Sequence, residues 1–235
     1  MDEVDNIEKP ITYSYALGYS NLLEVLFLIG WMIIICTSVA LSGVFADEKN
    51  RTDALILSSR NGRTPICIAK MMASISVSLL QTFIMLGACF GVMFAFYGNH
   101  GWSAMIQNVI PSSAWNITIG NMVMICIGLA VIYSIFFAMT NILISHVTHS
   151  AVVTMALHAT FVFIGLFNVL ARLGTIAKLW ELRPSMPLYY GTFCNTFRYG
   201  KMNNVETFIV IYISCIVALA VALVALYRKS QVESR

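Results

Sequence analysis

The chain has 235 residues, of which 59% are hydrophobic and only 11% are charged. A soluble domain carries about 25% charged residues, so this composition excludes an ordinary soluble domain. The net charge of +3 is scattered over several connecting segments, which argues against the concentrated basic face that nucleic-acid binding requires. The apolar residues instead form long charge-poor runs, the distribution that a lipid bilayer imposes.

Five of these runs are long enough to cross a hydrocarbon core, which takes about 20 residues in a helix. They cover residues 22–46, 71–97, 117–145, 151–170 and 207–227. Helices are favoured over barrel strands because each run is continuously apolar and a helix satisfies its own backbone hydrogen bonds in lipid. The sequence therefore predicts an all-α, polytopic integral membrane protein in which residues 1–235 form one transmembrane domain.

Two connecting segments have compositions that predict local structure. Residues 47–65 begin with mixed charges and continue into an apolar patch at residues 54–57. That pattern predicts a short helix on the membrane surface, and Thr64 followed by Pro65 predicts the start of the next span. Residues 171–206 mix basic and aromatic side chains, which is typical of segments at headgroup level. We therefore expect interfacial or re-entrant helices before the last span.

The basic residues favour an orientation with the N-terminus outside and the C-terminus inside. If residues 47–65 are cytoplasmic, the inner side holds Lys49, Arg51, Arg60, Arg63, Lys70, Arg228, Lys229 and Arg235. The outer side then holds Lys9, Arg172, Lys178, Arg183, Arg198 and Lys201. The excess of basic residues on the inner side is small. Several of them lie close to the ends of their spans, however, where basic residues have the largest effect on orientation.

The sequence contains no pattern of residues that predicts an enzyme. No Gly-x-x-x-x-Gly-Lys-Ser/Thr motif occurs, so the chain is not expected to bind ATP by itself. His158 is the only ionisable group well inside a predicted span, and a lone imidazole there is more often a hydrogen-bonded packing residue than a catalyst. His146 and His149 lack a third ligand nearby. We predict no catalytic residue, no cofactor and no metal site.

Small and polar residues within the spans point to helix packing. Gly87 and Gly91 are four residues apart, a spacing that lets another helix approach closely. Polar side chains inside the apolar runs must find hydrogen-bond partners in lipid and could line a path; they are Ser74, Ser76, Ser78, Gln81, Asn121, Thr140 and Asn141. None of them identifies a cargo.

The charged residues at positions 47–53 allow two interpretations. They form either a solvated connector or a surface that docks a partner through complementary ion pairs. The apolar patch at residues 54–57 favours docking, because a simple hydrophilic connector would not need it, although burial against the membrane surface would also account for it.

One stretch of the chain resembles the permeases of ABC-2-type transporters. It consists of Phe45-Ala46-Asp47-Glu48, residues 52–63, and Ile68-Ala69-Lys70. In that family a phenylalanine and a glutamate close one membrane helix, and a short amphipathic coupling segment follows. The segment ends in a serine, glycine and basic cluster before a lysine opens the next helix.

The resemblance implies the membrane subunit of an ATP-driven exporter. It places Glu48, Asp53, Arg60 and Arg63 in a cytoplasmic segment that contacts a separate ATPase subunit, which would hydrolyse the ATP. It also implies a homodimer, or a heterodimer with a similar permease, in a plasma membrane such as the bacterial cytoplasmic membrane.

The sequence departs from the family in one respect: the family generally has six spans, and this sequence predicts five. Residues 2–21 resemble the end of the external loop that would follow a first span. We expect either a truncated version or a first helix supplied by a neighbouring polypeptide. Two other functions remain open: a membrane accessory or immunity protein that does not transport, and, less favoured, an intramembrane hydrolase.

Overall fold

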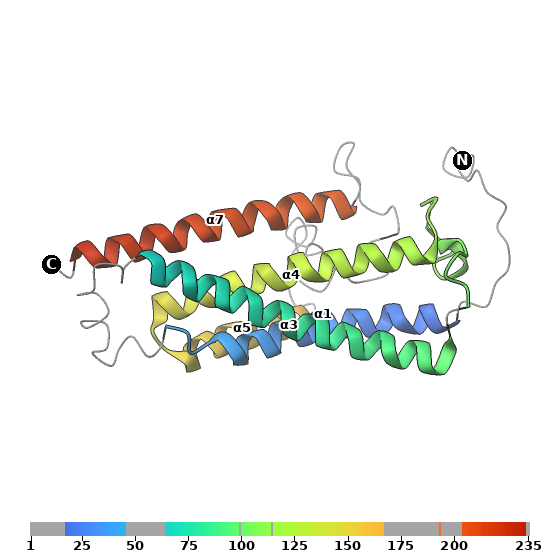
Figure 1. Cartoon of the computed structure of the whole chain (residues 1–235), viewed down its shortest axis with the longest axis horizontal. Coiled ribbons are helices and arrows are strands. Elements are labelled where there is room, and N and C mark those ends of the chain that lie inside the picture. The colour runs from blue at the N-terminus through green and yellow to red at the C-terminus, as the bar shows by residue number, and fades with distance from the viewer. Residues whose placement is uncertain are drawn as a thin grey trace. The chain divides into compact units, whose positions relative to one another are not determined.

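The computed structural model describes residues 17–45, 64–98, 100–113, 115–166, 193 and 204–233. Its elements in chain order are α1 (Leu17–Leu41), α3 (Thr64–Tyr97), the 3₁₀ helix η2 (Ile106–Asn108), α4 (Ile119–Thr148), α5 (Ala151–Leu166) and α7 (Asn204–Glu233) (Figure 1). Within these residues the only β-structure is an isolated bridge between Met105 and Thr118. The prediction of an all-α fold is confirmed for this part of the chain.

Among the described residues, four helices are long and apolar enough to cross a membrane, which indicates a multi-pass membrane protein. They are Gly18–Leu41, Pro65–Tyr97, Ile119–Thr148 and Val205–Leu226. The described part of α5 has 16 residues, roughly 24 Å of helix, and is too short by itself to count as a span. Residues 167–170 of the fourth predicted span, 151–170, lie outside the described residues, so that span stays a prediction. The segment at 171–206, expected to be interfacial, is described only at Phe193 and from residue 204 onward.

The first predicted span ends earlier than expected, at Leu41 instead of residue 46. The backbone N–H of Val44 donates to the carbonyl of Leu41 at 3.2 Å, which tightens the chain into a turn. Phe45 is fully buried. Its apolar character therefore reflects packing within the protein and does not extend a helix through lipid.

α3, α4 and α7 are longer than the predicted spans. α3 begins at Thr64 with Pro65 in its first turn, as the start signal indicated, so Lys70 lies inside the helix and does not mark its beginning. α4 continues to Thr148, where the Thr148 hydroxyl donates to the carbonyl of Ile144 at 2.8 Å. The connection between the predicted spans 117–145 and 151–170 is therefore only two residues long, His149 and Ser150.

The chain divides into two compact units, each built from segments distant in sequence. Unit 1 takes its residues from Met1–Met32, Phe83–Val131 and Leu170–Val210. Unit 2 takes its residues from Ile33–Thr82, Ile132–Val169 and Ile211–Arg235.

In unit 1 the connection between α3 and α4 is an ordered structure centred on Trp102. The Trp102 ring lies 6.4 Å from that of Tyr19 and 6.3 Å from that of Phe94, centroid to centroid. The Gln107 amide donates to the carbonyls of Ser113 and Trp115 at 3.2 and 2.9 Å. The connection between the predicted spans 71–97 and 117–145 is thus held by specific contacts.

In unit 2 the core includes a mixed hydrophobic cluster and an aromatic cluster. The mixed hydrophobic cluster contains the buried residues Phe45, Cys67, Met139, Ile142 and Leu223. The aromatic cluster joins α4 to α7, with the Tyr212 ring 6.1 Å from that of Tyr133 and 5.1 Å from that of Phe136. Most of these contacts are edge-on, the geometry that aromatic pairs prefer.

The spanning helices differ in how much of their surface the chain itself covers. Of the most apolar 18-residue stretch, 56% is buried in α1 and in α4, against 17% in α3 and 11% in α7. α3 and α7 therefore leave most of their apolar side chains for lipid or for another protein.

Candidate functional site

The residues expected to contact an ATPase, Glu48, Asp53, Arg60 and Arg63, all lie outside the described residues. The structure does describe the two flanks of their segment. One flank is Phe45, at the end of the turn that follows α1, and the other is Lys70, in the second turn of α3.

Those two flanking residues are in contact. The Lys70 ammonium lies 4.2 Å from the centroid of the Phe45 ring. A cation over an aromatic face is attracted by the negative charge density of the ring. The Phe45 ring is fully buried, so this contact joins the end of the α1 turn to the beginning of α3.

The end of α4 completes the same site. The backbone N–H of Phe45 donates to the Ser145 hydroxyl at 3.2 Å, and that hydroxyl donates to the carbonyl of Ser42 at 2.8 Å. The His146 ring lies edge-on to the Phe45 ring at 5.0 Å. We call Phe45, Lys70, Ser145 and His146 the junction cluster. It binds together the exit from α1, the start of α3 and the end of α4.

A second polar group, which we call the hydroxyl cluster, joins the same three helices among their apolar side chains. It consists of Thr37, Ser78, Thr82 and Ser134, all at most 1% exposed. The Ser78 and Ser134 hydroxyls are 2.7 Å apart, and Thr82 donates to the Ser134 hydroxyl at 2.9 Å. The Thr37 hydroxyl lies 3.4 Å from that of Ser78. These bonds pair polar groups that lipid could not satisfy.

No family model, curated protein or solved structure matches the chain.

His158 has the surroundings of a packing residue. It is 4% exposed, its Nδ1 atom lies 2.9 Å from the carbonyl of Thr154, and its ring lies 6.3 Å from that of Phe137. Because a carbonyl can only accept a hydrogen bond, Nδ1 carries the proton. The nitrogen is thus occupied by a local bond to the preceding turn of the same helix.

His146 and His149 lie side by side, with ring centroids 5.6 Å apart. Within the described ranges, no group of three His, Cys, Asp or Glu side chains gathers in a way that could hold a metal ion. The pair is thus a feature of the α4–α5 connection next to the junction cluster.

Gly87 and Gly91 lie on an outward-facing side of α3. Both are exposed, and a Cβ atom added at either position would meet nothing within 4 Å. No described helix of this chain packs on them, so close packing at these glycines stays a prediction that would need a second chain.

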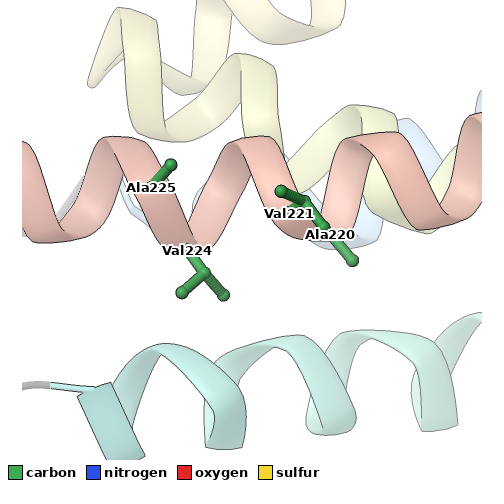
Figure 2. Close-up of a pocket in the computed structure, with 4 residues that line it drawn as sticks. All are labelled: Ala220, Val221, Val224 and Ala225. Atoms are coloured by element: carbon green, nitrogen blue, oxygen red, sulfur yellow. The ribbon is translucent and has the colours of Figure 1, made fainter.

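α7 carries a separate hollow of about 380 Å³ lined by small apolar side chains, namely Ala220, Val221, Val224 and Ala225. Figure 2 shows the Val224 side chain pointing toward the neighbouring cyan helix, α3. The lining side chains contain no hydrogen-bonding group. The hollow offers nothing that would select a polar cargo.

Sequence reasoning found part of the hydroxyl cluster and missed the rest. Ser74, Ser78 and Thr82 recur every four residues, so a polar stripe on one face of α3 could have been extended to Thr82. Thr37 and Ser134 are single hydroxyl residues in apolar runs and carry no such periodic signal. Their partnership depends on tertiary packing, which the sequence pattern does not reveal.

Proposed function

We propose that this chain is the membrane subunit of an ATP-driven exporter in a plasma membrane such as the bacterial cytoplasmic membrane. The ATPase activity belongs to a separate cytoplasmic subunit, and residues 47–65 are the segment that this subunit contacts. Glu48, Asp53, Arg60 and Arg63 provide the complementary charges. The chain binds no cofactor of its own.

The junction cluster is the observation that carries this proposal. A segment that receives a push can move helices only if both of its ends are held against them. Phe45 and Lys70, which flank the segment, contact each other, and Phe45 also contacts Ser145 and His146 of α4. This arrangement supports a coupling role better than it supports a free surface loop, whose ends would need no such anchoring.

The mechanism is mechanical. ATP binding closes the ATPase pair, residues 47–65 move as a lever, and the junction cluster passes the displacement to α1, α3 and α4. Packed interfaces of this kind switch between discrete arrangements and do not deform continuously. Two permease chains then alternate between inward-open and outward-open states.

The second permease chain is either another copy or a similar protein. The open surface at Gly87 and Gly91 supports an approach by a helix from such a chain, because glycines allow backbones to come close in lipid. α3 is also one of the two spans that this chain leaves mostly uncovered.

Charge reversal in the coupling segment tests the proposal. Glu48→Lys and Asp53→Lys are expected to uncouple ATP hydrolysis from transport in reconstituted vesicles while leaving membrane insertion intact, because these positions lie outside the apolar helices. Asp5→Lys, a charge reversal outside that segment, is the matched control and is expected to leave coupling unchanged.

The first measurement is whether an ATPase subunit co-purifies with the unaltered chain and whether its hydrolysis rate depends on the chain. Unchanged coupling in both variants would remove Glu48 and Asp53 from the interface. Absence of any ATPase partner would instead favour an accessory or immunity protein that does not transport.

A further inference from the structure

In unit 2, a side chain of α4 is inserted into the turn that follows α1. The carbonyl of Ser42 and the backbone N–H of Phe45 are three residues apart, the separation at which a β-turn closes with a direct hydrogen bond. Here the Ser145 hydroxyl lies between the two groups. It accepts from the Phe45 N–H at 3.2 Å and donates to the Ser42 carbonyl at 2.8 Å. The turn is therefore bridged by a residue 100 positions away in the chain.

The bridged groups are buried, so water does not replace the Ser145 hydroxyl when it leaves. Ser42 is 1% exposed, and Phe45 and Ser145 are fully buried. A buried backbone N–H or carbonyl without a partner costs free energy. Once the hydroxyl is withdrawn, the two groups can pair with each other, which closes a turn of 3₁₀ helix at the end of α1. The preceding turn already has this form, with the Val44 N–H donating to the Leu41 carbonyl at 3.2 Å.

The residues of this turn are suited to both conformations. Residues 43–45 continue the apolar run of α1, which is why the sequence predicts a span to residue 46. Ser42 and Gly43, in contrast, have low helix propensity and favour an end at Leu41. The φ of Gly43 lies outside the left-handed region, and a Cβ atom added there meets nothing within 4 Å. Because neither conformation is strongly preferred locally, a single hydroxyl can decide between them.

The turn lies where the coupling segment joins the membrane helices. Phe45 is two positions before residue 47, so a displacement of residues 47–65 reaches it first. Its ring contacts Lys70 and His146. Successive residues of a helix are rotated about its axis, so winding of residues 42–45 would turn the Phe45 ring away from these contacts. The state of the turn therefore sets the position of the ring.

We propose that Ser145 is a positioning residue for coupling. Its hydroxyl holds residues 42–45 in the bridged turn, and its withdrawal lets these residues wind onto α1. The bridged and wound turns are the two discrete arrangements through which movement of residues 47–65 reaches α1 and α4. The consequence for transport rests on the proposed function, whereas the state of the turn does not depend on an ATPase.

Solid-state NMR of the full chain in lipid vesicles tests the state of the turn. The ¹³Cα chemical shifts of residues 42–45 distinguish helical from non-helical backbone. Ser145→Ala is expected to move these shifts toward helical values, and Ser145→Thr, which keeps a hydroxyl, is expected to leave them non-helical. Thr140→Ala is the matched control, because the Thr140 hydroxyl donates to the Phe137 carbonyl of its own helix. It is expected to leave the shifts unchanged.

Gly43→Ala reaches the wound state by a second route that leaves α4 intact. Alanine favours a helix over glycine, so the wound fraction is expected to rise several-fold while Ser145 is still present. Residues 42–45 that stay non-helical in both Ser145→Ala and Gly43→Ala would overturn the proposal.

The role in coupling has its own readout, the amount of substrate exported for each ATP hydrolysed. Ser145→Ala is expected to lower this ratio several-fold, and Ser145→Thr is expected to restore it. An unchanged ratio in a chain whose turn has wound would overturn the positioning role. Absence of any ATPase partner would contradict the proposed function, and the NMR shifts would then still decide whether Ser145 holds the turn.

Discussion

Lys70 is a basic residue inside an apolar helix, and its contact with Phe45 gives it a definite role. Replacement by methionine keeps the length and apolar stem of the side chain but removes the charge over the ring. We expect Lys70→Met to lower the stability of the protein by about 1 kcal/mol, within the range measured for cation–π contacts. Lys70→Arg keeps a cation and is expected to retain most of that stability.

Stability is measured by thermal unfolding in detergent. Coupling of ATP hydrolysis to transport is measured after the ATPase subunit has been identified. A Lys70→Met protein that unfolds and couples like the unaltered chain would show that the contact with Phe45 is incidental.

Gly120 illustrates a position where only the absence of a side chain permits the observed packing. A Cβ atom there would lie 2.6 Å from Cε2 of Trp102, closer than real atoms approach. The Trp102 ring is itself held among other aromatic rings. We expect Gly120→Ala to destabilise the protein by about 1–3 kcal/mol, the usual cost of overpacking.

Gly128 on the same helix is the matched control, since an added Cβ there meets nothing within 4 Å. Gly128→Ala is expected to be neutral or to stabilise by up to about 1 kcal/mol through helix propensity. Equal unfolding temperatures for the two variants would contradict the packing described for Trp102.

At the scale of helices, the stability of two variants compares a buried hydroxyl that is hydrogen-bonded with one that is not. Ser134→Ala removes the hydroxyl that Ser78 and Thr82 share. We expect a loss of about 1 kcal/mol, in keeping with hydrogen bonds between membrane helices, which average about 0.6 kcal/mol each.

The neighbouring Tyr133 provides the comparison. It is 1% exposed, and its hydroxyl has no hydrogen-bond partner in the described part of the chain. Tyr133→Phe is expected to leave stability unchanged or slightly raised, because burial of an unpaired hydroxyl costs free energy. Unfolding in detergent measures both variants, and a larger loss for Tyr133→Phe than for Ser134→Ala would refute the assignment.

The sequence predicted the centres of the four spanning helices better than it predicted their ends. A continuously apolar run of about 20 residues satisfies its backbone hydrogen bonds in lipid as a single helix, which is why the centres were predicted correctly. The ends depended on tertiary contacts. Residues 43–45 are apolar because Phe45 is buried in a cluster of unit 2, and Lys70 is tolerated within α3 because its charge rests on that same ring.

For the whole molecule, the sequence predicts a coupling role for residues 47–65, which stays a prediction, and gives no sign of how the flanks of that segment are held. Phe45 and Lys70 are 25 positions apart, and Ser145 lies 100 positions beyond Phe45. No periodicity or local motif connects residues at such distances. These residues come into contact because α1, α3 and α4 pack together. This packing is the reason that residues 47–65 are a candidate lever.

The side of the membrane on which this connector lies is the most direct test of the account. Asn50→Cys places a thiol in the connector, and Ser103→Cys places one in the connection at the other end of α3, where the native side chain is exposed. Intact cells are treated with a membrane-impermeant maleimide, and labelling above that of the native cysteines is measured. We predict that Ser103→Cys is labelled and that Asn50→Cys is labelled only after the cells are opened. Labelling of Asn50→Cys on intact cells would place the connector outside and contradict its contact with a cytoplasmic ATPase.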